Sequence, residues 1–254
     1  MGRVAYGEQE AAAFEAARHI PDRGLAQWRT AIARHLAPRP GMRVLDLGAG
    51  TGWWASAFAR WYGIEVVAVE PSPAMRARSR HSPMLAGEAG ALPVAGNAVD
   101  GAWLSTVVHH LPDLRAAAAE LARVLRPGAP VLIRSVFRGR HDGIQLFRYW
   151  PEASAALDAF PTIGDVRAAF ATAGFTCSAL DRVPQISADS LATMAADPQR
   201  DAHTPLKLIS DAAYAAGVAR LRAAAATDCG PVIDTLDLLV LHRGRSHSRS
   251  RPVA

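Results

Sequence analysis

Three glycines and two carboxylates are the residues of this chain best suited to hold a nucleoside-like ligand. Gly48, Gly50 and Gly52 follow an apolar segment in the pattern Gly-x-Gly-x-Gly, and Asp46 lies just before them. Glycine permits backbone conformations that other residues resist and lets the backbone approach a ligand closely. Glu70 ends a second apolar segment about 20 positions later, the interval at which a carboxylate reaches ribose hydroxyls.

The spacing of these glycines separates two classes of ligand. The dinucleotide fingerprint reads Gly-x-Gly-x-x-Gly, whereas here the third glycine comes one residue earlier and Trp53 stands at the dinucleotide position. This difference disfavours an NAD-dependent dehydrogenase. After Glu70, Ser72 is a suitable helix N-cap and Pro73 suits the first helical position, so a second strand-to-helix unit is expected.

Three later segments continue in an order that matches a known family. Residues 84–93 carry Glu88, residues 105–113 read Ser-Thr-Val-Val-His-His-Leu-Pro-Asp, and Leu-Arg-Pro-Gly at 125–128 precedes another apolar strand. Together with the glycine turn, they resemble the class I S-adenosylmethionine-dependent methyltransferases of the small-molecule type. The resemblance is close over residues 41–137 and looser from there to the end.

The resemblance implies an α/β protein with the Rossmann-like fold of that family. The expected sheet has seven strands, mostly parallel with an antiparallel last strand, and it is accompanied by N-terminal helices and helical lid insertions. S-adenosyl-L-methionine is the implied cofactor. The implied acceptor of the methyl group is a small molecule, such as an aromatic or heteroaromatic specialised metabolite.

The family's cofactor contacts can be carried over to matching positions. Asp46 and the glycines would hold the amino-acid part of the cofactor, and Ser105 would line the same side. Glu88 stands where the family more often has Asp and would accept a hydrogen bond from the adenine amino group, although a loop carboxylate in solvent is the alternative. The expected cofactor-binding set is Asp46, Gly48, Ala49, Gly50, Gly52, Glu70, Pro71, Met75, Glu88, Ala89 and Ser105.

Two adjacent histidines are the candidates for catalytic proton transfer. His109 and His110 follow the predicted fourth strand, where the resemblance places the reacting methyl group, and histidine titrates near neutral pH. A base is needed only when the acceptor must lose a proton of high pKa, so packing or loop hydrogen bonding is the alternative role. Tyr6, ahead of the first helix, is a third catalytic candidate that could orient the nucleophile. No metal site is expected, because Cys177 and Cys229 lack neighbours at metal-ligand spacing.

The length of 254 residues fits one α/β domain with additions. Residues 1–40 are expected to form an N-terminal helical cap with helices over 8–19 and 24–37. Residues 41–242 would form the methyltransferase domain, and 243–254 a disordered basic tail. Later patterns predict a helix over 165–173, a sixth strand over 175–183, a helix over 211–226 and a last strand over 232–241.

Two segments exceed the minimal domain, near 138–161 and 184–230, at positions where substrate-covering elements are usually inserted. The first carries Phe147, Tyr149 and Trp150. These aromatic side chains would either stack on an aromatic acceptor at the mouth of a cleft or pack the insertion onto the sheet.

Four other side chains are weaker candidates for the substrate cavity. Trp28 and Trp53 could form part of its wall, although a core position is favoured for Trp28. His141 and Arg148 in the first insertion could contact a polar substrate group, but an exposed surface position is the favoured interpretation for both.

The composition limits the partners. The net charge of +5 comes largely from arginines in the last residues, so the rest of the chain is nearly neutral. No apolar run reaches the roughly 18 residues that span a bilayer, no signal-peptide region begins the chain, and two isolated cysteines fit a reducing compartment. We therefore expect a cytoplasmic monomer or homodimer without a membrane partner, for which nucleic acid is an unlikely ligand.

Two alternatives stay open at this point. An RNA or protein methyltransferase is disfavoured because the chain lacks a basic stripe with interleaved aromatic residues. A module that binds the cofactor without turning it over is disfavoured by the complete set of motifs, and turnover would be needed to exclude it.

Overall fold

The structure, a computed structural model, describes residues 20, 22–198 and 200–245 of the chain. Tyr6, the helix predicted over 8–19 and most of the basic tail lie outside these residues. Among the residues described, seven strands form one sheet in the order β3-β2-β1-β4-β5-β7-β6. The fold class expected from the sequence is therefore confirmed.

The strand directions also agree with the expectation. β1 pairs in parallel with β2 and β4, β2 with β3, and β4 with β5, while β7 runs antiparallel between β5 and β6. Parallel neighbours need crossover connections, which helices supply here. The strands are β1 (Arg43–Leu47), β2 (Glu65–Val69), β3 (Met84–Leu85), β4 (Gly101–Ser105), β5 (Pro130–Ser135), β6 (Phe175–Ala188) and β7 (Val232–Arg243).

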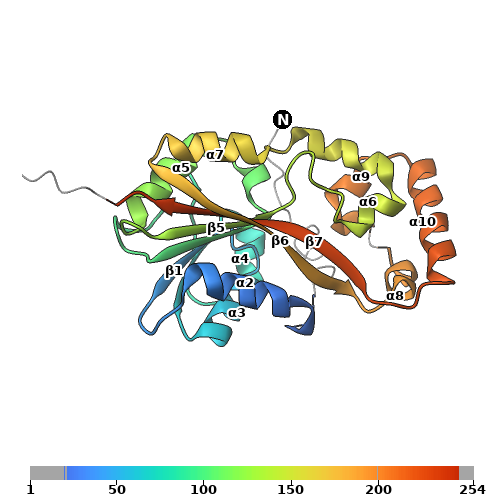
Figure 1. The fold of residues 1–254 in the computed structure, drawn as a ribbon, viewed down its shortest axis with the longest axis horizontal. Helices are drawn as coiled ribbons and strands as arrows, with labels where there is room; N and C mark the ends of the chain where they lie inside the picture. The colour runs from blue at the N-terminus through green and yellow to red at the C-terminus, as the bar shows by residue number, and fades with distance from the viewer. Residues whose placement is uncertain (1–19, 21, 199, 246–254) are drawn as a thin grey trace, which may run out of the picture.

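Helices cover both faces of this sheet (Figure 1). On one face, α2 (Ala26–Leu36) and α3 (Trp53–Tyr62) pack on one hydrophobic cluster, and on the other α5 (Leu114–Val124) and α7 (Ile163–Ala171) pack on a second. Alternate residues of β1 point to opposite faces, so Val44 joins the first cluster and Leu45 the second. A short 3-10 helix, Asp22–Leu25, precedes α2, and α4 (Pro73–Ala77) follows β2.

Several predicted boundaries were wrong by a few residues, and two of them have a clear physical reason. β6 continues to Ala188 rather than ending at Val183, because it keeps pairing with β7, so the second insertion leaves the sheet at 189 instead of 184. α7 begins two residues earlier than predicted. Thr162 forms a capping box with Asp165, accepting a hydrogen bond from its backbone N–H at 3.0 Å, and this fixes the start of the helix.

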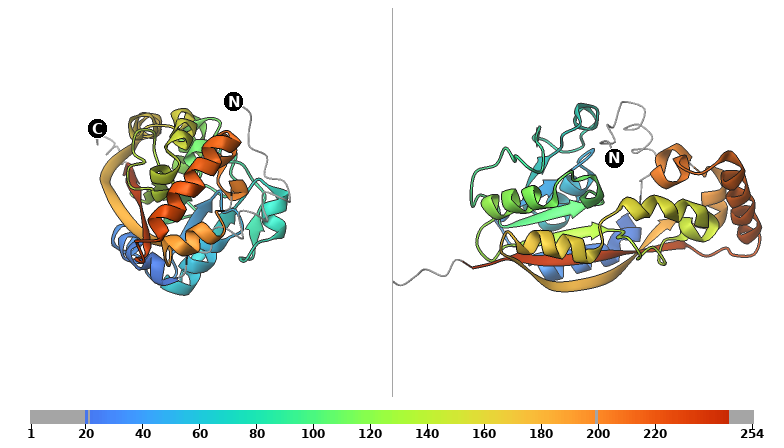
Figure 2. Two further views of the ribbon diagram at one scale, coloured as in Figure 1. Left: turned by 90° about the vertical axis from the view of Figure 1, so that its right-hand side faces the viewer. Right: turned by 90° about the horizontal axis from the view of Figure 1, so that it is seen from above.

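The two insertions form a single helical unit beyond the carboxyl end of the sheet. The β6–β7 hairpin projects past Ser135, the last residue of β5, and bears the unit at its far end (Figures 1 and 2). We call residues 138–161 and 189–231 the lid. Its helices are α6 (Gln145–Tyr149), a 3-10 helix (Pro151–Ala159), α8 (Leu191–Ala196), a short 3-10 helix (Arg200–Ala202), α9 (Thr204–Lys207) and α10 (Asp211–Ala225).

Polar contacts fasten the lid to the hairpin. The Arg140 guanidinium donates two hydrogen bonds, at 2.6 and 2.8 Å, to the buried carboxylate of Asp237 on β7. The backbone N–H of Thr235 donates to the carbonyl oxygen of Gly143 at 2.7 Å. Bidentate pairing and backbone pairing both restrict orientation, so the lid is held at a defined angle to the sheet.

The aromatic residues of the first insertion are mostly lid core. Tyr149 and Trp150 are only 4% and 1% exposed, and they share a hydrophobic cluster with Leu191, Leu206 and Leu221 of the second insertion. Tyr149 and Trp150 therefore do not line an open cleft, and they pack one insertion on the other rather than on the sheet. Phe147 is half-buried.

The position of Trp28 and the character of the helices also bear on the expectations from the sequence. Trp28 is fully buried and packs edge-on against Trp103, at 6.2 Å between ring centroids, as favoured from the sequence. None of the helices in the described part of the chain is both long enough and apolar enough to cross a bilayer.

Candidate functional site

The glycine turn lies where β1 ends and α3 begins, at the carboxyl edge of the sheet. Gly48, Gly50 and Gly52 all have positive φ, at 70°, 58° and 72°, a region that favours glycine. At Gly48 there is a steric reason as well, because a Cβ atom there would lie 2.4 Å from Cγ2 of Val107. A side chain at position 48 would therefore prevent the turn from closing against the loop that follows β4.

Glu70 connects this turn to the end of β2. One carboxylate oxygen accepts a hydrogen bond from the backbone N–H of Gly50 at 2.9 Å, and the other accepts one from the N–H of Ser72 at 2.9 Å. Burial raises the pKa of Glu70, and the two N–H groups oppose that rise. The structure thus directs the carboxylate of Glu70 at the glycine turn, and the ribose contact expected from the sequence spacing stays a prediction.

Asp46 is a buried carboxyl group at this edge that keeps hydrogen-bonding capacity. Its side chain is 1% exposed, and in the described part of the chain its Oδ2 atom has no hydrogen-bond partner. Burial, followed by the negative charge of Glu70, raises the pKa of Asp46 to about 8. A buried carboxyl oxygen without a partner suits a ligand that brings hydrogen-bond donors or a cationic amino group. These residues therefore fit the cofactor that the sequence resemblance implies.

The other residues predicted to contact the cofactor differ in how exposed they are. Ser72 caps α4, accepting from the backbone N–H of Met75 at 3.3 Å, and Met75 itself is 2% exposed. Pro71 and Glu88 are exposed, whereas Ala49, Ala89 and Ser105 are half-buried. Met75 and Pro71 therefore differ sharply in how accessible their side chains are to a ligand.

The two histidines lie in a 3-10 helix, Val108–His110, directly after β4. The His109 ring stacks on Phe160 of the lid, with 4.0 Å between centroids and 7° between planes, and it also contacts the His110 ring at 4.0 Å. A hollow of about 590 Å³ adjoins this stack, between the histidine loop, the start of α5 and the base of the lid. His109 is thus tied to the lid, and both histidine rings are half-buried.

An arginine that the sequence analysis did not single out lies beside this edge. Arg134 on β5 is 5% exposed, and its guanidinium donates to Oε1 of Gln185 at 2.6 Å and to Oγ of Ser105 at 3.2 Å. The same group lies over the rings of Trp28 and Trp54, at 5.0 and 5.4 Å from their centroids. In the sequence, Arg134 could have been noticed as the one charged residue within the apolar run 131–136.

A half-buried carboxyl group continues this polar cluster toward the lid. Asp234 on β7 accepts hydrogen bonds from the Ser187 hydroxyl at 2.5 Å and from the backbone N–H of Gln145 at 2.7 Å. Burial raises the pKa of Asp234, while those two donors and the charge of Arg134 act in the opposite direction. The cluster therefore links the end of β4 to the first residue of α6.

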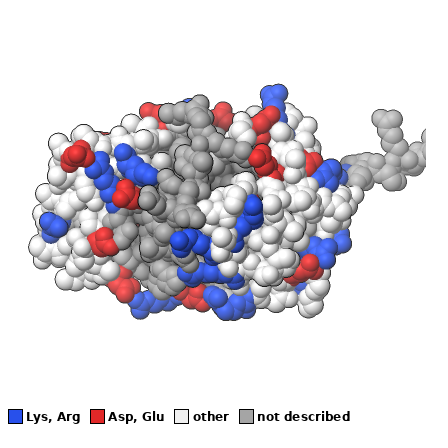
Figure 3. Space-filling view, turned by 180° about the vertical axis from the view of Figure 1, so that it is seen from behind, with Lys and Arg blue, Asp and Glu red and all other residues white. Residues whose placement is uncertain are grey.

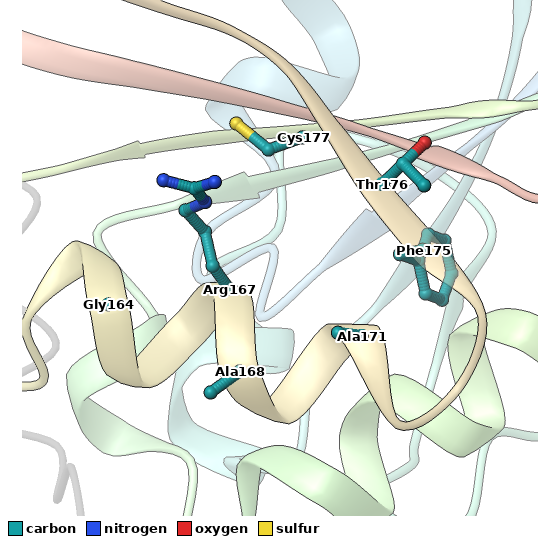
Figure 4. A pocket seen from close by; sticks show the side chains of 7 residues that line it. All are labelled: Gly164, Arg167, Ala168, Ala171, Phe175, Thr176 and Cys177. Atoms are coloured by element: carbon teal, nitrogen blue, oxygen red, sulfur yellow. The ribbon is translucent and has the colours of Figure 1, made fainter.

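A second hollow, of about 510 Å³, lies at the opposite edge of the sheet. Figure 4 shows Arg167 extending from α7 toward the start of β6, where Cys177 lies. Phe175 begins β6 and pairs with Arg243, next to the amino end of β5, so this hollow is remote from the glycine turn. It contributes nothing to the site.

The surface charges on one face and the two cysteines show no sign of a nucleic-acid interface or a disulfide among the residues described. Figure 3 shows acidic and basic side chains interspersed on the face that it draws, rather than gathered by sign into separate regions. Mixed charge is unlike the basic stripe with which proteins bind nucleic acids. Cys177 and Cys229 are free and exposed.

Comparisons with known proteins agree with this geometry. Residues 45–133 match the family described as "Methyltransferase domain". The chain is 36% identical over 108 residues to a demethylmenaquinone methyltransferase of Corynebacterium kroppenstedtii, covering 42% of this chain and 47% of that protein. The chain thus spans about half the length of the relatives it matches.

Two solved structures share the fold over most of this chain. A candidate methyltransferase from an antibiotic biosynthesis pathway of Anabaena variabilis superposes with a TM-score of 0.68 at 20% identity, covering 88% of this chain and 99% of that one. Phosphoethanolamine N-methyltransferase 2 of Haemonchus contortus, in complex with S-adenosyl-L-methionine, gives a TM-score of 0.60 at 18% identity, covering 96% and 59%.

Proposed function

Because this chain belongs to the class I S-adenosylmethionine-dependent methyltransferases, we propose that it transfers a methyl group from that cofactor to a small-molecule acceptor. One observation carries the proposal: the buried Asp46 carboxyl and the Glu70 carboxylate flank a turn of three glycines with positive φ at the carboxyl edge of a parallel sheet. Ligands of open α/β sheets bind at that edge.

Each side chain at this edge has a proposed task. Asp46 would pair with the amino group of the cofactor, and Glu70 would accept from the ribose hydroxyls while it holds the turn. Glu88 would accept from the adenine amino group. Gly48, Ala49, Gly50, Gly52, Pro71, Met75, Ala89 and Ser105 complete the proposed binding set.

The chemistry needs little from the protein beyond alignment and the exclusion of water. When bound, the cofactor supplies a methyl group already activated by its sulfonium. The turn and Ser105 would fix its orientation, and the lid would cover the edge from which an acceptor enters. His109 and His110 follow β4 at that edge, and we propose that one of them accepts a proton when the acceptor must lose one.

The small size of the acceptor is supported by the lid. Its two insertions pack on each other and are fastened to the β6–β7 hairpin, which limits the space above the carboxyl edge. The half-buried indoles of Trp53 and Trp54, at the start of α3, could face an aromatic or heteroaromatic acceptor. We also propose a cytoplasmic location, in keeping with two free thiols.

Equilibrium binding tests the cofactor first. Calorimetric titration with S-adenosylhomocysteine should show one site per chain, whereas NAD and NADP should not bind. Binding of either dinucleotide without binding of the adenosyl thioether would contradict the proposal.

Turnover is tested separately with labelled cofactor and a panel of small acceptors, each product being analysed by mass spectrometry. Methylation of RNA or of a protein in place of every small acceptor would support the alternative class. Salt dependence adds a check, because activity on phosphate-rich polymers falls steeply with salt.

A further inference from the structure

We propose that Arg134 recognises an ionised oxygen of the acceptor, so that this protein selects phenols, enols or carboxylic acids and binds them as anions. The inference deepens the proposed function and rests on it. It assigns a specificity-determining role to a side chain outside the glycine turn and outside the histidine pair.

The position of Arg134 is the first argument. It pairs in register with Ser105, the last residue of β4, and its guanidinium donates to the Ser105 hydroxyl at 3.2 Å. The guanidinium also contacts the ring of Trp54, the second residue of α3, and α3 is the helix that follows the glycine turn. The positive charge therefore lies beside the elements that would hold the cofactor.

The other side of the guanidinium faces the elements that carry the lid. Gln185 accepts its second hydrogen bond at 2.6 Å, and Gln185 lies on the part of β6 that projects past the end of β5. Ser105 and Trp54 are half-buried, whereas Gln185 is 6% exposed. The charge of Arg134 therefore lies between the end of β4 and the hairpin that bears the lid.

The guanidinium is held in a fixed orientation before any ligand arrives. The guanidinium lies over two indole rings, and two neutral oxygen atoms accept hydrogen bonds from different nitrogens. Arginine stays protonated even when buried, and its planar fork matches the geometry of anionic oxygens. Preorganisation of this kind lowers the entropic cost of binding an anion.

The charge is also felt by a neighbouring ionisable group. Arg134 favours the ionised form of the Asp234 carboxyl, in opposition to the effect of burial. Coulombic interactions are stronger in a buried environment than in water. The same field acting on a bound phenol or enol would lower the pKa of its hydroxyl, which would reduce the need for a general base such as His109.

Binding to the protein loaded with S-adenosylhomocysteine tests this inference without turnover. The probe is 4-nitrophenol, whose phenolate absorbs visible light, and 4-nitroanisole is its neutral match. Titration of each against loaded protein at several pH values gives an affinity and the apparent pKa of the bound phenol. For wild type we expect that pKa to lie below its value in water.

The variants separate charge from packing. Arg134→Met should weaken binding of 4-nitrophenolate at least tenfold and abolish the pKa shift, while 4-nitroanisole binding changes little. Arg134→Lys should keep part of both effects. Gln185→Leu, which removes one anchor of the guanidinium, provides a second variant if Arg134→Met does not fold. Arg167→Met removes an exposed arginine at the opposite edge of the sheet and is the matched control.

The outcomes are distinct. Equal loss of 4-nitrophenolate and 4-nitroanisole binding in Arg134→Met would show that the arginine only packs, and would overturn the inference. Failure of the loaded wild-type protein to bind 4-nitrophenolate would also overturn the inference. Failure of wild-type protein to bind S-adenosylhomocysteine would instead overturn the proposed function itself.

Discussion

Trp150 of the first insertion lies against Gly217 of α10, and its indole N–H donates a hydrogen bond to the carbonyl oxygen of Tyr214 at 3.0 Å. The contact is so close that a Cβ atom on Gly217 would lie 2.0 Å from the indole nitrogen. Glycine within a helix costs about 1 kcal/mol relative to alanine. At this position the cost is offset by the space that the indole needs to join the two insertions.

Replacing that glycine should therefore destabilise the lid. Gly217→Ala improves helix propensity but overpacks a buried contact, and overpacking costs about 1–3 kcal/mol. We expect a lower urea midpoint and faster amide exchange in α10. Gly164→Ala on α7 is the control, since its Cβ would meet only Thr162 Oγ1 at 3.5 Å. An unchanged midpoint for Gly217→Ala would contradict this packing.

Glu70 should matter more for cofactor binding than any other carboxylate on β2 or directly after it. Glu70→Ala leaves the N–H groups of Gly50 and Ser72 without their acceptor. Hydrogen bonds to a charged group contribute about 1.5–3 kcal/mol, so affinity for S-adenosylhomocysteine should fall by tenfold or more by calorimetry. Glu65→Gln, which removes an exposed charge that pairs with Arg43 at the amino end of β2, is the matched control. Similar losses in both variants would argue against a special role for Glu70.

Asp46 should make cofactor binding depend on pH. Its pKa is raised from 3.8 to about 8 in the folded chain by burial and by Glu70. Between these values the unfolded chain is ionised while the folded chain holds a proton, so this group lowers the stability of the free protein as pH rises through that window. A cationic amino group of the ligand would favour the carboxylate, and binding below pH 8 should release a proton.

Calorimetry in two buffers with different ionisation enthalpies measures that proton directly. Affinity for S-adenosylhomocysteine should rise from acidic pH up to about 8 and then level off. In Asp46→Asn the proton release should vanish, and the free protein should lose less stability between pH 4 and 8. A pH-independent affinity in wild type would exclude pairing between this carboxyl and the ligand's amino group.

His109 and Phe160 should be energetically coupled. Their rings stack at 4.0 Å and 7°, and aromatic pairs of this kind contribute about 0.5–1.5 kcal/mol beyond burial. A double-mutant cycle with His109→Ala and Phe160→Ala, read out by urea unfolding, should give a coupling energy in that range. The cycle with His110→Ala and Phe160→Ala is the comparison, and simple additivity in the His109 cycle would speak against the stack.

Turnover by the same variants addresses the proposed base. If one histidine accepts a proton, its alanine variant should lose about 10²–10⁴-fold in kcat at saturating cofactor. Phe160→Ala should lower kcat only through the position of His109. Near-normal rates in both histidine variants would remove the base role from this pair.

Local pattern predicted the individual strands and the glycine turn, and the resemblance to a known family implied how the strands assemble into one sheet. The glycine turn and the acidic residue after β2 belong to one strand-helix-strand unit. Their positions in the sequence are therefore enough to predict that they lie at the same edge of the sheet. The boundary of β6 was harder to predict, because its last residues pair with a strand more than 40 positions away. Tyr149 and Trp150 were ambiguous for the same reason: their partners lie in the other insertion.

The sequence by itself indicated the family, the succession of strands and helices along the chain and the residues expected at the cofactor edge, since these can be recognised from motifs and their spacing. Only the tertiary structure placed Arg134 beside Ser105, left Asp46 buried with an unpartnered oxygen among the residues described, and joined the two insertions into one lid. Each of these depends on contacts between distant segments, and burial and electrostatic fields arise only when such segments pack together.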